Sequence, residues 1–174
     1  MVSTHANPDK SAAAKAVAPR RSTLDWALEG VALLALLTAV AVVAIHWRDL
    51  PETVPNGYGL TGSPTAWSDK NHLWKVVRDA AGFWALFTVI ALPLGSVARR
   101  VPEVLPLIRR QLLVFKTVMM LFFAHLIWSS VNVALGRAQG IEPAFDLAVV
   151  LAATLTVIVY TVKIARRIAL RPRV

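Results

Sequence analysis

Polar side chains recur along the third apolar segment of the chain, where they could carry protons or bind a ligand inside a membrane. His125, Ser129 and Asn132 follow one another at spacings of four and three residues, so an α-helix places them on one face. This stripe could instead be structural, with side chains that form hydrogen bonds between helices. We favour the structural interpretation, because no carboxylate within the membrane is close in sequence to His125. Glu29, at the edge of the first apolar segment, is predicted to lie at headgroup level.

Patterns typical of catalytic or metal sites are missing from the sequence. It has no HExxH pair, no DxD pair and no cysteine, so thiolate metal sites and disulfides are excluded. His46 and His72 are both expected near the outer membrane interface, but single interfacial histidines seldom form a metal site. The sequence therefore predicts a protein that is not an enzyme and holds no cofactor or metal.

Four uncharged runs dominate a chain that is 56% hydrophobic and 17% charged. They cover residues 30–47, 80–98, 117–136 and 147–162, with lengths of 18, 19, 20 and 16 residues. At ~1.5 Å per residue, the three longer runs reach roughly 27–30 Å, the hydrocarbon thickness of a bilayer. The stems of Lys163 and Arg166 can extend the fourth run to the headgroups. The sequence predicts an all-α integral membrane protein with four transmembrane helices, at about 26–47, 74–98, 111–135 and 143–165.

The distribution of basic residues predicts the orientation in the membrane. Of the 19 Lys and Arg residues, 14 fall in the N-terminal tail, the connection between the second and third helices, or the C-terminal end. The other five fall on the opposite face, so the positive-inside rule places both termini in the cytoplasm. Basic residues at helix ends bind anionic headgroups, so the net charge of +9 indicates membrane lipid and no nucleic-acid partner.

The chain divides into five predicted segments. Residues 1–24 form a disordered cytoplasmic tail, and Ser22 or Thr23 is the candidate cap of the first helix. Next come a first helix pair at 25–98 with an outer loop at 48–73, a cytoplasmic loop at 99–110, a second helix pair at 111–165 and a basic cytoplasmic tail at 166–174. The loop at 99–110 is predicted because its two prolines discourage a helix. The small pairs Ala35/Ala39 and Ala148/Ala152 are predicted to allow close helix contacts.

Proline and glycine alternate along the outer loop, which is not low in complexity. Proline fixes φ and glycine permits positive φ, so the sequence predicts successive turns. Tyr58 and Trp67 are expected to pack onto the membrane interface. The loop is therefore predicted to be an ordered connector that folds against the membrane surface.

The loop residues also follow a longer pattern, Leu-Pro-x-x-Val-Pro, then an aromatic residue, then Gly-x-Pro, then Trp-x-x-Lys. The residues on this pattern are Leu50, Pro51, Val54, Pro55, Tyr58, Gly62, Pro64, Trp67 and Lys70. The pattern, and its place just after the first span, resembles the domain of unknown function 1648, the SdpI-type family of bacterial membrane proteins. The likeness covers 21 residues. It implies a bacterial inner-membrane protein, and the family's best-known branch gives immunity to a secreted peptide toxin and holds a transcriptional repressor at the membrane.

Two loop positions depart from the family pattern. The family usually has His before the aromatic residue, where this chain has Gly57, and Asp after the second proline, where it has Thr65. If that His and Asp bind a ligand in other members, this chain has lost that ligand. The second membrane motif of the immunity branch is not found in residues 100–174.

The sequence thus predicts a multi-pass bacterial inner-membrane protein that binds or senses a protein or peptide partner through its outer loop. Toxin immunity and signal transduction are the most specific forms of this function. The alternative is a scaffold subunit of a transporter or other membrane complex, as a homo- or hetero-oligomer. A membrane enzyme ranks last because the catalytic residues are missing.

Overall fold

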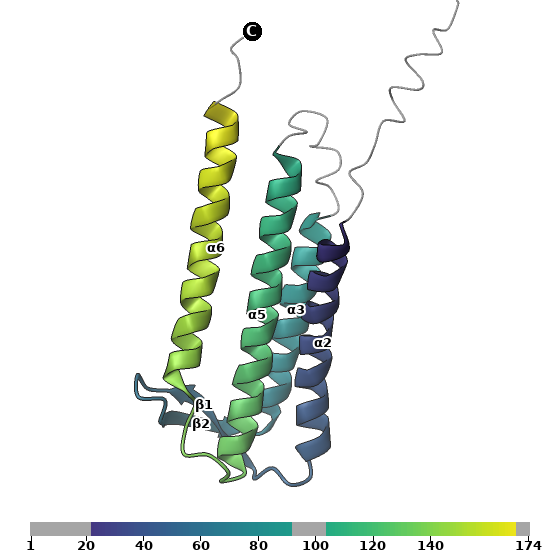
Figure 1. Ribbon diagram of the computed structural model, residues 1–174. Coiled ribbons are helices and arrows are strands. Elements are labelled where there is room, and N and C mark those ends of the chain that lie inside the picture. The colour runs from purple at the N-terminus through teal and green to yellow at the C-terminus, as the bar shows by residue number, and fades with distance from the viewer. Residues whose placement is uncertain (1–21, 92–103, 170–174) are drawn as a thin grey trace, which may run out of the picture.

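The computed structural model describes residues 22–91 and 104–169, which form four helices and one small sheet. In chain order these are α2 (Thr23–His46), β1 (Thr53–Tyr58), β2 (Pro64–Asp69), α3 (Asn71–Ala91), α5 (Leu105–Ala134) and α6 (Pro143–Ala169). The helices run alternately up and down, so α2 begins, α5 begins and α6 ends at the same end of the bundle (Figure 1). The two strands lie at the other end (Figure 1).

Helix α2 begins at a capping box, as its sequence predicts. The Ser22 hydroxyl accepts a hydrogen bond from the Asp25 N–H at 3.2 Å, and the Asp25 carboxylate accepts one from the Ser22 N–H at 3.0 Å. Together these bonds close the first turn, where the Asp25 N–H also bonds to the Ser22 carbonyl at 3.0 Å. The predicted cap is confirmed, with Ser22 in that role.

On α2, three alanine side chains face the interior of the bundle, while most leucine side chains are exposed. Ala32, Ala35 and Ala39 are buried in α2, whereas Leu34 is 64% exposed. Small residues let helices approach closely where lipid, and not water, surrounds them. Three helices, α2, α5 and α6, are long and apolar enough to cross a membrane. The fold is therefore compatible with that of a membrane protein.

Helix α3 is not among the three described helices that are long and apolar enough to cross a membrane. Lys75, Arg78 and Asp79 all lie within its first nine residues and are exposed. Its predicted apolar span continues to Ala98, with a possible kink at Pro93, and both lie outside the described residues. The fourth span is taken up below as a proposal.

Helix α6 stands at the side of the bundle and packs mainly against α5 (Figure 1). Ala153 is its one buried residue among those described. Ala148 and Ala152 are exposed, so the prediction that this pair makes a close helix contact is wrong. The Ala35/Ala39 prediction is confirmed, because both side chains are buried.

Two sequence predictions need correction. Helix α5 begins at Leu105 and not near 111, so residues 105–110 belong to a helix and not to the predicted loop at 99–110. Pro106 is tolerated there because it lies in the first helical turn, where its missing N–H would have no helical partner. The fold is also not entirely α-helical, since the outer loop contains a β-hairpin.

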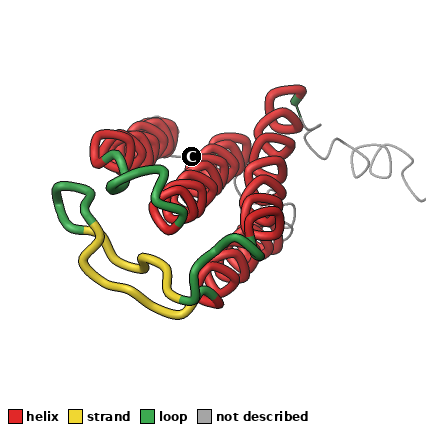
Figure 2. Tube along the Cα trace, turned by 90° about the horizontal axis from the view of Figure 1, so that it is seen from below, coloured by secondary structure: helices red, strands yellow, loops and turns green. Residues whose placement is uncertain are grey.

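The hairpin pairs β1 with β2 in antiparallel register, from Thr53 opposite Asp69 to Tyr58 opposite Pro64. The register shifts on both sides of Gly57, as at a β-bulge. Proline is compatible with this two-stranded sheet because both strands are edge strands. Seen from the end of the bundle where the strands lie, the hairpin runs along one side of the helices (Figure 2). The predicted turns are thus replaced by paired strands.

Candidate functional site

The hairpin is fixed to the helices through buried residues of the loop pattern. Leu50 is 4% exposed, Val54 is 0% exposed, and Pro55 is also fully buried. Leu50 and Val54 join a cluster with residues of α2, α3 and α5, which includes Ile127 and Val131. Burial of this apolar surface attaches the hairpin to the ends of three helices.

Tyr58 adds a polar attachment at the end of β1. Its hydroxyl donates a hydrogen bond to Ser130 Oγ of α5, with an oxygen-to-oxygen distance of 2.9 Å. Burial raises the pKa of the Tyr58 phenol above its usual value, and the Ser130 hydrogen bond opposes part of that rise. The phenol is therefore neutral at physiological pH and is held as a hydrogen-bond donor.

Gly62 attaches the hairpin turn to the connection between α5 and α6. Its carbonyl accepts a hydrogen bond from the Ile141 N–H at 2.9 Å, and its φ is +81°. A Cβ at this position would collide with the Ile141 carbonyl oxygen and lie 3.1 Å from Pro143 Cδ. Only glycine combines this backbone conformation with so close a contact.

Lys70 closes the base of the hairpin. Its Nζ lies 2.9 Å from Glu52 Oε1 and 5.4 Å from the centre of the Trp47 ring. Trp47 in turn contacts Trp74 of α3, with ring centroids 6.0 Å apart. Lys70 therefore links the hairpin to the junctions with α2 and α3.

The free side of the hairpin presents apolar groups. Leu60 at the turn is fully exposed, and Trp67 of β2 is 56% exposed. The two family departures lie nearby. A Cβ at Gly57 would lie 3.1 Å from Ala66 Cβ, and Thr65 is exposed. Of the other pattern residues, Pro51 is exposed and Pro64 is half-buried.

The polar stripe of α5 is placed on one helix, as predicted, but its described hydrogen bonds stay within α5. Ser129 Oγ lies 3.4 Å from His125 Nε2, and the Asn132 amide donates to the Trp128 carbonyl at 3.0 Å. The contact with another helix comes from the His125 ring, whose centroid lies 3.8 Å from that of Phe145 in α6. Within the described residues, the stripe contacts α6 through two tilted rings, 34° apart, instead of the expected hydrogen bonds.

His46 and His72 lie in different environments. His46 Nε2 is 3.2 Å from Arg137 Nη1, while its Nδ1 lies 3.0 Å from the Val42 carbonyl oxygen. His72 lines a cavity of about 40 Å³ beside Tyr58 and Ser130. No group of three or more His, Cys, Asp or Glu side chains that could hold a metal occurs in the described part of the chain.

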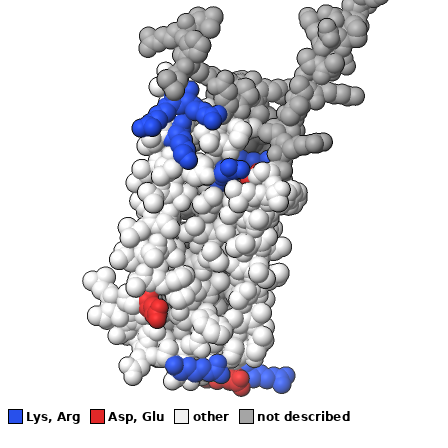
Figure 3. Space-filling model, in the orientation of Figure 1, with Lys and Arg blue, Asp and Glu red and all other residues white. Residues whose placement is uncertain are grey.

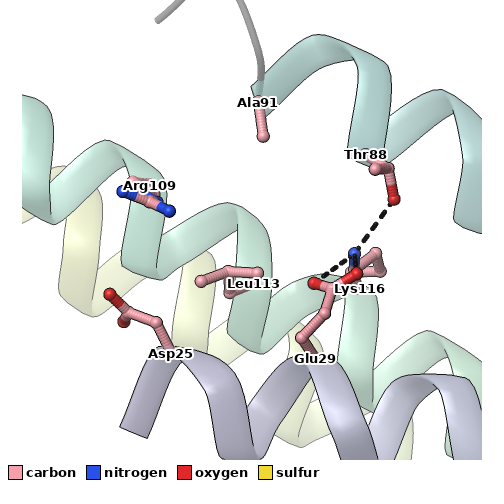
Figure 4. Close-up of a pocket in the computed structure, with 7 residues that line it drawn as sticks. All are labelled: Asp25, Glu29, Thr88, Ala91, Arg109, Leu113 and Lys116. Atoms are coloured by element: carbon pink, nitrogen blue, oxygen red, sulfur yellow. Dashed lines mark hydrogen bonds and ion pairs between the residues drawn. The ribbon is translucent and has the colours of Figure 1, made fainter. Parts of the chain in front are cut away.

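A buried ion pair in the half of the bundle away from the hairpin was not expected from the sequence. Lys116 of α5 is 2% exposed, and its Nζ lies 2.6 Å from both carboxylate oxygens of Glu29 in α2. The same Nζ donates to Thr88 Oγ1 of α3 at 3.2 Å and lies 5.3 Å from the centre of the Trp84 ring. Lys116 thus connects three helices at one level (Figure 4).

Glu29 was expected at headgroup level, but its side chain faces the bundle and is 22% exposed. A cavity of about 50 Å³ adjoins the pair, with Asp25 and Arg109 among its lining residues (Figure 4). One sequence signal could have found the pair: two opposite charges that each interrupt an apolar helix near the same end. An ionisable residue inside a membrane seldom lacks a partner.

Comparisons with protein-family models, with curated proteins and with solved structures gave no match. The resemblance to the domain of unknown function 1648 therefore stays a prediction that rests on the loop residues.

Proposed function

We propose that this chain is a bacterial inner-membrane protein that acts without catalysis and binds a protein or peptide partner through its outer hairpin. One observation carries the proposal. The hairpin is held to the helices by Leu50, Val54 and Tyr58, yet the side chains of Leu60 and Trp67 are exposed. A rigid support that presents a large aromatic and an aliphatic side chain loses little conformational entropy on binding. Toxin immunity or signal transduction would be its most specific form.

The proposal includes four membrane spans with both termini in the cytoplasm. Basic side chains gather at the end of the molecule where α6 ends, and much of the face between the two ends carries no charge (Figure 3). Helix α3 runs antiparallel to α2 along the bundle, which supports its role as the fourth span (Figure 1). The hairpin would then lie outside the cytoplasm.

Site-specific photocrosslinking in living cells tests the partner. A photoreactive residue replaces Leu60 or Trp67, and a matched control places it at Thr53, an exposed position on β1. We expect a discrete crosslinked protein or peptide at positions 60 and 67, and little or none at position 53. In a second set of variants, each with the photoreactive residue at position 60, Trp67→Ala should reduce the yield of crosslinked partner, while Thr65→Ala should not.

Crosslinks to lipid alone at both positions would show that Leu60 and Trp67 anchor the hairpin in the membrane interface. In that case the hairpin is not a docking surface, and the proposal fails.

A scaffold role in a larger membrane complex is the second candidate. It is favoured by α6, whose described length has Ala153 as its single buried residue and so offers almost a whole helix surface to neighbours. Gentle purification from native membranes distinguishes the two functions. If the complex survives removal of residues 143–174 but is lost in Trp67→Ala, the hairpin binds the partner. If it survives Trp67→Ala but is lost when residues 143–174 are removed, the scaffold role is supported.

A further inference from the structure

Two opposite charges lie side by side on the outward face of α3. Arg78 Nη2 is 3.2 Å from Asp79 Oδ1, and their side chains are 75% and 63% exposed. Among the described residues, these two side chains form their ion pair with each other and with no other helix. Adjacent side chains on a helix point in different directions and meet only at their ends. Arg78 and Asp79 can therefore contact each other and still bind a further partner.

Packing contacts place this pair level with the middle of α2. Val77 belongs to a cluster with Ala39 and Val42, and Ala80 belongs to one with Ala32 and Ala35. Arg78 and Asp79 lie between Val77 and Ala80, so they are level with residues 35–39 of α2. That stretch is the middle of the uncharged run 30–47.

Charged groups at such a level normally face the interior of a bundle or pair with one another. Arg78 and Asp79 do pair with each other, but the pair is exposed on the outside of the bundle, where lipid would leave it poorly solvated. Lys75 lies one turn nearer the outer end, where its stem can reach the headgroups. Arg78 and Asp79 lie about one turn deeper than Lys75, and the Asp79 side chain is too short to reach the headgroups from there. A further protein surface over this face would shield both groups from lipid.

We propose that this surface is α3 of a second copy of the chain. An adjacent positive and negative charge is self-complementary. A two-fold axis along the membrane normal brings Arg78 of one copy to Asp79 of the other, and Asp79 to Arg78. This forms two ion pairs between copies with no charge left over.

The same face continues with residues suited to close helix contact. Gly82 is one turn farther along, and a Cβ there would meet nothing within 4 Å. Leu86 and Val89 follow at helical spacing and are 54% and 59% exposed. Glycine allows two backbones to approach, and the apolar residues beyond it pack against their counterparts. The interface involves no residue of the hairpin, but it rests on the proposed crossing of the membrane by α3.

Disulfide crosslinking tests the interface directly, because the chain has no cysteine of its own. Gly82→Cys should form a dimer of twice the 18.9 kDa mass when native membranes are oxidised. A disulfide requires the two Cα atoms to come within about 7 Å, so it reports close approach at that position. Leu34→Cys is the matched control, because Leu34 is 64% exposed on α2 and outside the proposed face.

Charge reversal then tests the pairing in the Gly82→Cys background. Arg78→Asp leaves two negative charges on the face and Asp79→Arg leaves two positive charges, so each alone should lower the crosslinked fraction on the order of tenfold. Co-expression of the two variants, each with its own tag, should restore a mixed dimer.

The proposal is overturned if Gly82→Cys crosslinks no more than Leu34→Cys, or if the mixture stays as low as the single variants. The first comparison uses chains with all charges intact, so it decides the matter even if the reversal variants accumulate poorly.

Discussion

Glu29 and Lys116 show how single residues can join three helices inside an apolar bundle. Lys116 Nζ contacts Glu29 of α2 and Thr88 of α3, and both carboxylate oxygens lie within hydrogen-bond distance. A buried charge is stable only when its partner is present, because desolvation of an isolated ion is expensive. In the sequence, Glu29 directly precedes the uncharged run 30–47 and Lys116 directly precedes the run 117–136, so each reads as the edge of an apolar segment. Their pairing depends on how α2 and α5 are aligned against each other, which the sequence pattern alone does not give.

Removal of one member of this pair should destabilise the protein far more than loss of an exposed pair. We expect Lys116→Met to lower the free energy of unfolding by about 3 kcal/mol, because it leaves the Glu29 carboxylate unpaired. The double variant Glu29→Leu with Lys116→Met should recover most of that loss, since apolar replacement of both charges is often neutral. Unfolding titrations in detergent micelles measure these changes.

Glu52→Gln is the matched control for this series. Glu52 is 81% exposed in its ion pair with Lys70, so its loss should cost no more than about 1 kcal/mol. If Lys116→Met and Glu52→Gln cost the same, the inner pair adds nothing to the stability of the bundle.

At the scale of elements, the helices were predictable and the hairpin was not. Long uncharged runs identify α2, α5 and α6 because a membrane requires continuous apolar length. The hairpin lacks the alternating apolar pattern that identifies a strand. None of the residues of β2 is buried, and β1 is fixed by Val54 and Pro55 packing on the helices. Its strands therefore depend on tertiary contacts that no local pattern records.

The hairpin turn should be sensitive to a single methyl group. Gly62→Ala introduces a Cβ into a positive-φ position and against the Ile141 carbonyl, so it should destabilise the protein and release the turn from the α5–α6 connection. Gly136→Ala is the matched control, because Gly136 has a φ of +69° but open space around it.

We expect Gly136→Ala to cost about 1 kcal/mol from backbone strain alone, and Gly62→Ala to cost clearly more. Hydrogen exchange at the Ile141 amide is the direct measurement, because this N–H bonds to the Gly62 carbonyl. If hydrogen exchange at the Ile141 amide accelerates equally in Gly62→Ala and Gly136→Ala, the contact at Gly62 is not specific.

At the scale of the whole molecule, the arrangement of the helix ends bears on how many times the chain crosses the membrane. The start of α2, the start of α5 and the end of α6 share one end of the bundle, and the hairpin lies at the other (Figure 1). Helix α3 follows the hairpin and runs back along α2 and α5, with Thr88 reaching the level of Glu29 and Lys116. A helix packed in this way shares the depth of its neighbours, which favours four crossings despite the charges in its outer half.

Cysteine labelling of intact cells tests this topology. Leu60→Cys should react with a membrane-impermeant maleimide once the outer membrane is permeabilised, whereas Arg100→Cys and Val174→Cys should react only after the inner membrane is broken. The expectation follows from the 14-to-5 division of basic residues, because Lys and Arg are retained on the cytoplasmic side. The unsubstituted chain has no cysteine and is the blank. Early labelling of Arg100→Cys would show that α3 does not cross, and early labelling of Val174→Cys would place the C-terminus outside. A protected Arg100 together with a reactive Leu60 requires the chain to cross the membrane between them, and α3 is the segment that would do so.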